Sequence, residues 1–101
     1  MPEFARLSTL DVATDRIDDA VAFFSNADLQ GASGARGFRR AFWLLDRATG
    51  KGAELIVFDS REAIEGSERE EAEARTKARE AGVNLSSETI YEVVAEGRPG
   101  T

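Results

Sequence analysis

The sequence predicts an α+β, ferredoxin-like fold of order βαββαβ, with two helices covering one face of a four-stranded antiparallel sheet. The first observation behind this prediction is that strand-like and helix-like segments alternate in that order, with short breaks between them. The second is a pair of apolar runs, residues 41–45 and 55–58, on either side of a turn-rich segment. Such a pattern is typical of a β-hairpin.

The elements before the hairpin are a strand and a helix. Residues 4–12 contain β-compatible side chains and form the first predicted strand. Asp15 can cap a helix in which apolar residues recur at positions 17, 20, 21 and 24, the spacing of one helical face. The helix is expected to end near Leu29, and a glycine-rich connection over residues 30–37 follows.

Both hairpin strands are apolar on both faces, which indicates a sheet covered on two sides. We expect Asp46 to lie opposite Gly52 across the turn. That register places one set of side chains on the face covered by the helices, namely Phe38, Arg40, Phe42 and Phe58. It places a second set on the opposite face, namely Trp43, Leu45, Leu55 and Val57. A shift by one residue would exchange the faces.

The elements after the hairpin are a helix and a strand. Ser60 can cap a helix over residues 61–81, and Gly82 suits its left-handed end. Residues 88–95 form the fourth predicted strand. We therefore expect one domain over residues 1–96 and a flexible tail over residues 97–101.

Composition restricts the function. A net charge of −6 over 101 residues argues against nucleic acid and anionic membranes as partners. No apolar run is long enough to cross a bilayer and no leader segment is evident, so a cytoplasmic location is expected. The chain has no cysteine and no histidine, which removes thiolate nucleophiles, the Ser-His-Asp triad and the usual transition-metal ligands. No metal site and no cofactor are expected.

The covered second face predicts a partner. Exposing several large apolar side chains would forfeit several kcal/mol, at roughly 25 cal/mol per Å² of apolar surface. We expect two copies to pair through the face carrying Trp43, Leu45, Leu55 and Val57. A single sheet with a tolerated apolar patch is the alternative.

Four segments resemble the antibiotic biosynthesis monooxygenase-like family of the dimeric α/β-barrel superfamily, namely ARLSTL, GFRRAFWLLDRATGKG, LIVFDSREA and YEVV. The resemblance extends from about Ala5 to Ala95 and implies pairing of two ferredoxin-like domains into a dimeric barrel. It also implies a cofactor-independent monooxygenase acting on a small aromatic or polyketide-like substrate. The alternative is a non-catalytic barrel that binds a small apolar ligand or has no activity.

Individual positions narrow what the resemblance implies. Phe58 stands where the family usually has tryptophan, and Ser8 stands where haem-degrading relatives have asparagine. Those relatives bind haem through a histidine of the second helix, and the lack of histidine argues against haem degradation here. The monooxygenases of the group use Asn, Trp, Tyr and Arg to bind a phenol, and Trp43, Tyr91 and Arg40 supply three of these residue types.

The predicted substrate-binding residues are Ser8, Phe38, Arg40, Phe42, Phe58 and Tyr91. A small apolar or phenolic ligand is the expected occupant, and a guanidinium among aromatic rings suits an anionic or phenolate one. The alternatives are that Arg40 pairs with a carboxylate of a helix or extends to the rim of the pocket, and that Tyr91 lies in an interface.

The segment from Arg36 to Phe42 also resembles the RNA-contacting strand of RRM domains. There the motif lies on the third strand, whereas here it opens the second strand of an acidic chain, which argues against RNA binding.

Overall fold

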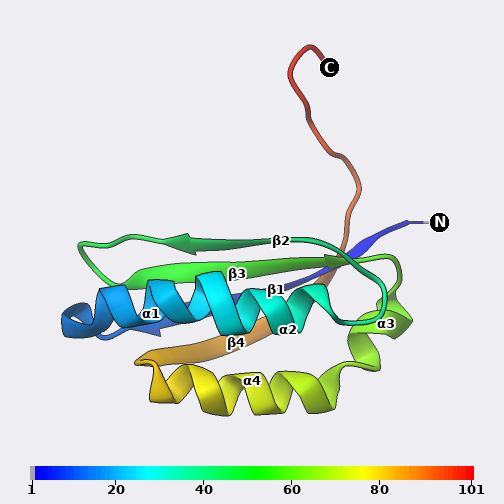
Figure 1. Ribbon diagram of the computed structural model, residues 1–101. Helices are drawn as coiled ribbons and strands as arrows, with labels where there is room; N and C mark the ends of the chain where they lie inside the picture. Colours follow the sequence, from blue (N-terminus) through cyan, green and yellow to red (C-terminus); the bar gives the residue numbers. More distant parts are fainter. Residues whose placement is uncertain (1) are drawn as a thin grey trace.

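The computed structural model describes residues 2–101 and has the predicted βαββαβ order (Figure 1). The four strands form one sheet in the order β2-β3-β1-β4, and every neighbouring pair is antiparallel. This arrangement confirms the ferredoxin-like fold. The strands are β1 (Phe4–Val12), β2 (Phe38–Leu45), β3 (Lys51–Phe58) and β4 (Val83–Glu92).

The first helical segment, which connects β1 to β2, is longer than predicted. It runs through η1 (Thr14–Arg16), α1 (Ile17–Phe23), the π-helical segment η2 (Phe24–Asp28) and α2 (Leu29–Ser33). Asp15 lies inside η1, and no side chain caps that turn or α1, so the predicted cap is wrong. The predicted glycine-rich connection is partly helical, because Gly31 sits within α2.

The second helical segment, which connects β3 to β4, is divided into α3 (Arg61–Glu65) and α4 (Glu68–Glu80) rather than forming one helix. The Ser60 side chain accepts a hydrogen bond from Ala63 N at 3.1 Å, which confirms the predicted cap. Between the two helices, the Ser67 hydroxyl donates to the carbonyl of Ile64 at 2.7 Å. Gly82 has φ +85°, the left-handed conformation expected after the last helix.

The predicted register of the hairpin is wrong by one residue. Leu45, not Asp46, pairs with Gly52, and Phe42 pairs with Leu55 rather than with Ile56. The cause lies in the turn, where Gly50 has φ +78° and donates its N–H to the carbonyl of Asp46 at 2.8 Å. The turn therefore closes with Asp46 N bonded to Lys51 O, one residue earlier than predicted.

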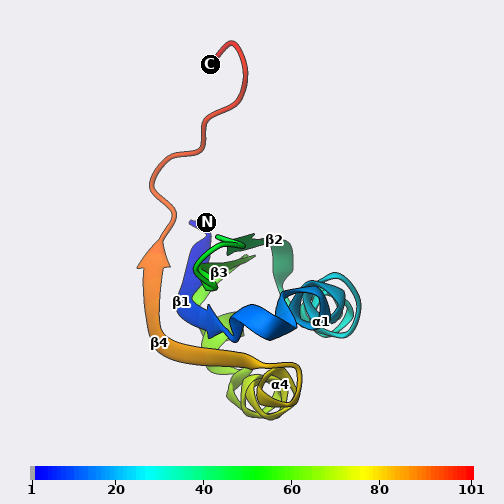
Figure 2. The same ribbon diagram turned by 90° about the vertical axis from the view of Figure 1, so that its left-hand side faces the viewer.

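This register decides which side chains face the helices, which lie together on one side of the sheet (Figure 2). Trp43 and Leu45 pack against the core cluster of Leu10, Val12, Ala20, Phe24, Ala78 and Val83. The prediction that Trp43 and Leu45 lie on the face opposite the helices, where a second copy would pair, is therefore wrong. Phe42, predicted on the helix side, lies on the opposite face and is 50% exposed. Leu55 and Val57 share that outer face, as predicted.

The last strand starts earlier than predicted, at Val83, and ends at Glu92. The chain then leaves the sheet as an extended segment that projects from the body of the molecule (Figure 1). Val93 N still bonds to Glu3 O at 2.8 Å. No helix within residues 2–101 is long and apolar enough to cross a membrane.

Candidate functional site

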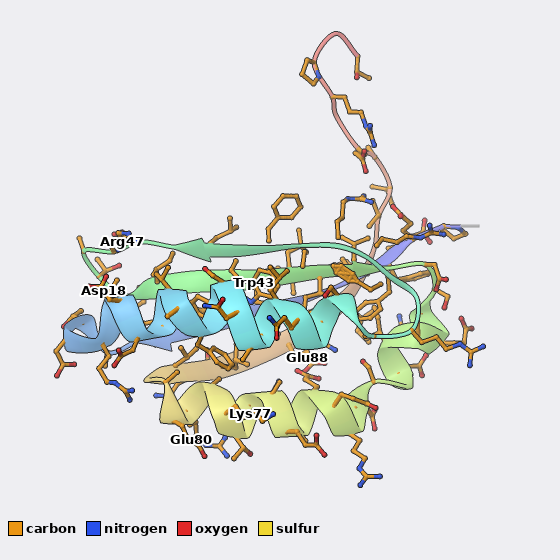
Figure 3. All side chains as sticks on the ribbon, in the orientation of Figure 1. Asp18, Trp43, Arg47, Lys77, Glu80 and Glu88 are labelled. Carbon is orange, nitrogen blue, oxygen red and sulfur yellow. The ribbon has the colours of Figure 1, made fainter. Side chains whose placement is uncertain are left out.

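A row of side chains crosses the helix-facing side of the sheet, one from each strand. Trp43 of β2 pairs with Glu54 of β3, Glu54 pairs with Ser8 of β1, and Ser8 pairs with Glu88 of β4. Glu54 is 5% exposed and Ser8 is 1% exposed, so the centre of the row is buried. Figure 3 shows the labelled Trp43 and Glu88 on the side of the sheet that carries the helices. Ser8 and Glu54 thus place two polar groups where an ordinary core would be apolar.

The π-helical segment η2 brings a second carboxyl group to this row. Such a segment contains one extra residue per turn, which changes the direction of the following side chains, and it is often found at functional sites. Asp28 is its last residue. The Trp43 indole N–H donates to Asp28 Oδ2 at 2.9 Å and to Glu54 Oε2 at 3.0 Å. One donor therefore holds both carboxyl groups together.

The surroundings of these two carboxyl groups favour a shared proton. Burial, the negative charge of Asp28 and a hydrogen bond with Asp28 raise the pKa of Glu54 to about 7. Burial also raises the pKa of Asp28. Near neutral pH the pair can release or take up one proton, as a general acid or base requires.

Arg6 supplies the cation nearest to the pair. Arg6 is 6% exposed, and the central carbon of its guanidinium lies 5.7 Å from the centre of the Phe58 ring. Its Nη1 donates to Ser67 Oγ at 3.2 Å and lies 3.7 Å from Glu71 Oε2. Within residues 2–101, Arg6 Nε and Ser8 Oγ are the buried side-chain polar atoms without a hydrogen-bond partner. Leaving such groups unpaired costs about 1–3 kcal/mol each, so a ligand that pairs with them gains affinity.

A second ionic cluster lies on the other side of Arg6, between α4 and β4. Arg75 Nη2 donates to Glu71 Oε1 at 3.1 Å and to Glu88 Oε2 at 2.7 Å. Burial, a hydrogen bond with Glu71 and the negative charge of Glu71 raise the pKa of Glu88. Arg6 therefore lies between two pairs of acidic residues.

A cavity of about 210 Å³ opens above this part of the sheet, between the first helical segment and α4. Its apolar lining includes Phe23, Ile56, Phe58 and Leu85. Its polar lining includes Arg6, Asp28, Glu54 and Glu71. An apolar cavity of about 150 Å³ can hold benzene, so this one has room for a substituted single ring. The combination of apolar walls and a few converging polar groups is typical of a small-molecule site.

The structure separates the predicted site residues. Phe58 lines the cavity, Ser8 lies beneath it next to Glu54, and Phe38 pairs with Phe58 at the end of β2. The other three, Arg40, Phe42 and Tyr91, belong to the outer face. Arg40 does not face the cavity, because its guanidinium bonds to both carboxylate oxygens of Glu3, at 3.2 and 3.0 Å, and also pairs with Glu96. The alternative prediction was a carboxylate of a helix, whereas Glu3 and Glu96 lie outside the helices, before β1 and after β4.

Several residues of the site were missed from the sequence. Arg6 lies between Ala5 and Leu7, and Glu54 lies between Ala53 and Leu55, so apolar neighbours on the chain were the only sequence signal that could have identified them as buried charges. Asp28 could not have been found this way, because its position depends on the π-helical segment. Among residues 2–101 there is no group of three or more Asp, Glu, His or Cys side chains placed to hold a metal ion.

The chain is similar in sequence to uncharacterized proteins and similar in fold to several solved structures. No protein-family model matches the chain. The chain is 29% identical over 89 residues to the uncharacterized protein Rv2557 of Mycobacterium tuberculosis. The match covers 87% of this chain and 40% of that protein, so the chain spans about two fifths of the length of this relative.

Three solved structures superpose over nearly the whole chain. A Chloroflexus aurantiacus protein provisionally named an antibiotic biosynthesis monooxygenase has a TM-score of 0.69, 17% identity, and coverage of 97% of this chain and 99% of its own. SnoaB, a cofactor-independent oxygenase from Streptomyces nogalater, has a TM-score of 0.65, 14% identity and 100% coverage of both chains. A dimeric ferredoxin-like protein from an uncultured marine organism has a TM-score of 0.65, 14% identity, and coverage of 96% and 100%. The chain therefore has the ferredoxin-like fold of the antibiotic biosynthesis monooxygenase-like proteins that its sequence resembles.

Proposed function

We propose that the chain is a cofactor-independent monooxygenase that acts on a small phenolic ring held in the cavity between sheet and helices. The observation that carries this proposal is the buried Asp28–Glu54 pair, which lines the cavity and has a Glu54 pKa of about 7. A carboxyl group with this pKa is matched to removing a phenolic proton near neutral pH. The fold shared with SnoaB, a cofactor-independent oxygenase, supports the same reaction class.

The roles of the residues follow from their positions. A neutral phenol binds with its hydroxyl toward Asp28 and Glu54, and the pair accepts its proton. The unpartnered Arg6 Nε can donate to the oxyanion that develops. The electron-rich ring then reacts with O₂, so that a ring CH₂ of the keto tautomer becomes C=O, and the second oxygen atom leaves in water.

Oxygen uptake tests this function. The purified chain should consume one O₂ per substrate with 1,4-dihydroxybenzene or 1,4-dihydroxynaphthalene, above the rate of spontaneous oxidation. Glu54→Gln removes the proton acceptor and should lower the rate by about 10²-fold or more. Glu65→Gln makes the same change on the exposed side of α3 and should keep the wild-type rate. Equal rates for Glu54→Gln and wild type would contradict the proposal.

The second candidate is a non-catalytic protein that binds a small apolar ligand. The apolar walls of the cavity, with Phe23, Ile56, Phe58 and Leu85, favour it. Binding of the same phenols without any oxygen uptake would select this candidate.

We also propose that two copies pair through the outer face of the sheet. Phe42, Leu44 and Tyr91 are 50%, 55% and 53% exposed there, although all three are large apolar or aromatic side chains. Leu7 and Leu55 lie between them in the register. Contiguous exposed apolar surface of this kind is typical of a protein interface.

A further inference from the structure

We propose that the cavity selects an uncharged or cationic ring and rejects an anionic one. This inference rests on the proposed function for the location of the ligand, but not on any oxidation. It reverses the expectation from Arg40, whose guanidinium would have favoured an anion. The charges that line the cavity carry the argument.

Acidic groups outnumber basic groups around the cavity. Five carboxyl groups line it, whereas Arg6 and Lys77 are its basic residues. The five are Asp28, Glu54, Glu70, Glu71 and Glu73. The whole chain has the same bias, with a net charge of −6. A cavity with low-dielectric walls strengthens the effect of such an excess on a charged ligand.

Neither basic residue places an uncompensated positive charge inside the cavity. Arg6 lies between Glu71, at 3.7 Å from Nη1, and the Asp28–Glu54 pair. Lys77 contributes to the lining from α4 and is exposed to solvent (Figure 3). An anion entering the cavity would therefore meet a guanidinium whose charge is already compensated, next to the carboxyl groups of the pair. Placing like charges together in a buried site is unfavourable.

The hydrogen-bonding groups of the cavity favour a ligand with both a donor and an acceptor. The carboxyl oxygens of Asp28 and Glu54 can accept from a hydroxyl or an ammonium group. Arg6 Nε, buried and unpartnered, can donate to an oxygen. A phenol hydroxyl satisfies both requirements by itself, whereas an added carboxylate on the ring brings a negative charge close to the carboxyl groups of the pair.

Three phenols of nearly equal size test the selection. They are tyramine, which is cationic, 4-(2-hydroxyethyl)phenol, which is neutral, and 4-hydroxyphenylacetate, which is anionic. The indole N–H resonance of Trp43, the only tryptophan, reports binding at the site in a titration followed by NMR. At pH 7.5 and low salt, we expect the anion to bind at least about tenfold more weakly than the other two, a difference of about 1.4 kcal/mol.

Charge variants show whether the cavity causes the selection. The double substitution Glu70→Gln and Glu73→Gln removes two charges from the lining and should narrow the difference between anion and cation several-fold. Glu65→Gln with Glu80→Gln removes two charges from residues outside the lining and should leave the difference within twofold. Equal effects of the two double variants would overturn the inference.

Two further outcomes would overturn it. One is tightest binding of 4-hydroxyphenylacetate, and the other is failure of all three phenols to shift the Trp43 resonance. The proposed oxidation fails separately. Selective binding without oxygen uptake would leave this inference standing, whereas oxygen uptake without charge selection would leave the proposed function standing.

Discussion

At the scale of the residue, Glu54 has the most unusual environment in the described part of the chain. It is 5% exposed on a central strand. The Trp43 indole N–H donates to its carboxyl group and also to that of Asp28. A carboxyl group in such a place is stable when it is neutral and costly when it is ionised. This single property links the stability of the fold to the proposed chemistry of the site.

The raised pKa of Glu54 predicts how stability changes with pH. The pKa rises from 4.5 to about 7 on folding, so the native state holds more protons than the unfolded state between these values. The free energy of unfolding should therefore fall as pH rises from about 4.5 to 7, and then stay level with respect to this group. Glu54→Gln should flatten this slope and be more stable than wild type at pH 8 by about 1–3 kcal/mol. Urea unfolding at several pH values measures both effects, and a wild-type slope retained in Glu54→Gln would refute the assignment.

Trp43→Phe isolates the contribution of the indole N–H. The hydrogen bonds from Trp43 lower the pKa of both Asp28 and Glu54, against the larger effect of burial. Removing the donor while keeping an aromatic ring should therefore move the titration of Glu54 above about 7. Carbon NMR of the side-chain carboxyl follows this titration directly. Phe23→Leu changes a cavity wall that makes no such bond and should leave the midpoint in place, and an unchanged midpoint in Trp43→Phe would count against the bridging role.

At the scale of the element, the hairpin turn sets the arrangement of the whole sheet. Gly50 has φ +78°, and a Cβ added there would lie 2.1 Å from the carbonyl oxygen of Val12. The N–H of Val12 also donates to the carbonyl of Gly50, at 2.7 Å. The turn is thereby fixed both to its own strands and to the end of β1.

Gly50→Ala should destabilise the fold by about 2–3 kcal/mol, because alanine avoids positive φ and its methyl group has no room. Gly97→Ala is the matched control, since no heavy atom lies within 4 Å of its added Cβ. Thermal or urea unfolding of the two variants makes the comparison. A loss of stability no greater than that of Gly97→Ala would mean that the turn can rearrange.

The same turn explains how far the sequence could predict the structure. The order of elements, the Ser60 cap and the left-handed Gly82 follow from local patterns, and the structure confirms them. The faces of β2 depend on whether Asp46 pairs with Gly52 or with Lys51, and both choices leave apolar residues on both sides. Because β2 is apolar on each face, hydrophobic alternation could not select the register. The error in register also made the predicted site wrong, because Trp43 lies on the helix side and Arg40 on the outer face, the reverse of the prediction.

At the scale of the whole molecule, the two faces of the sheet have different roles. The helix side carries the buried polar row and the cavity, and the outer side carries exposed apolar residues. Phe42, Leu44 and Tyr91 of the outer side are each about half exposed. Pairing of two copies through the outer face would leave both cavities open between their own helices.

Phe42→Lys tests this pairing. A lysine at a half-exposed position of the outer face should place like charges across the interface and convert a dimer into a monomer. Leu29→Lys is the control, because Leu29 is 40% exposed on α2, on the other side of the sheet. Light scattering coupled to size-exclusion chromatography measures the mass of each variant. A wild-type monomer at micromolar concentration, or a dimer that persists in Phe42→Lys, would contradict the proposed interface.

The polar row also makes the only tryptophan a sensor of strand alignment. A slip of β2 by one residue would bring Phe42 to the helix side and expose Trp43 to water. The emission of an indole shifts to longer wavelength when it becomes exposed. During refolding, the return of blue-shifted emission would therefore mark the moment at which the hairpin reaches its native alignment, before any ligand or oxygen is added.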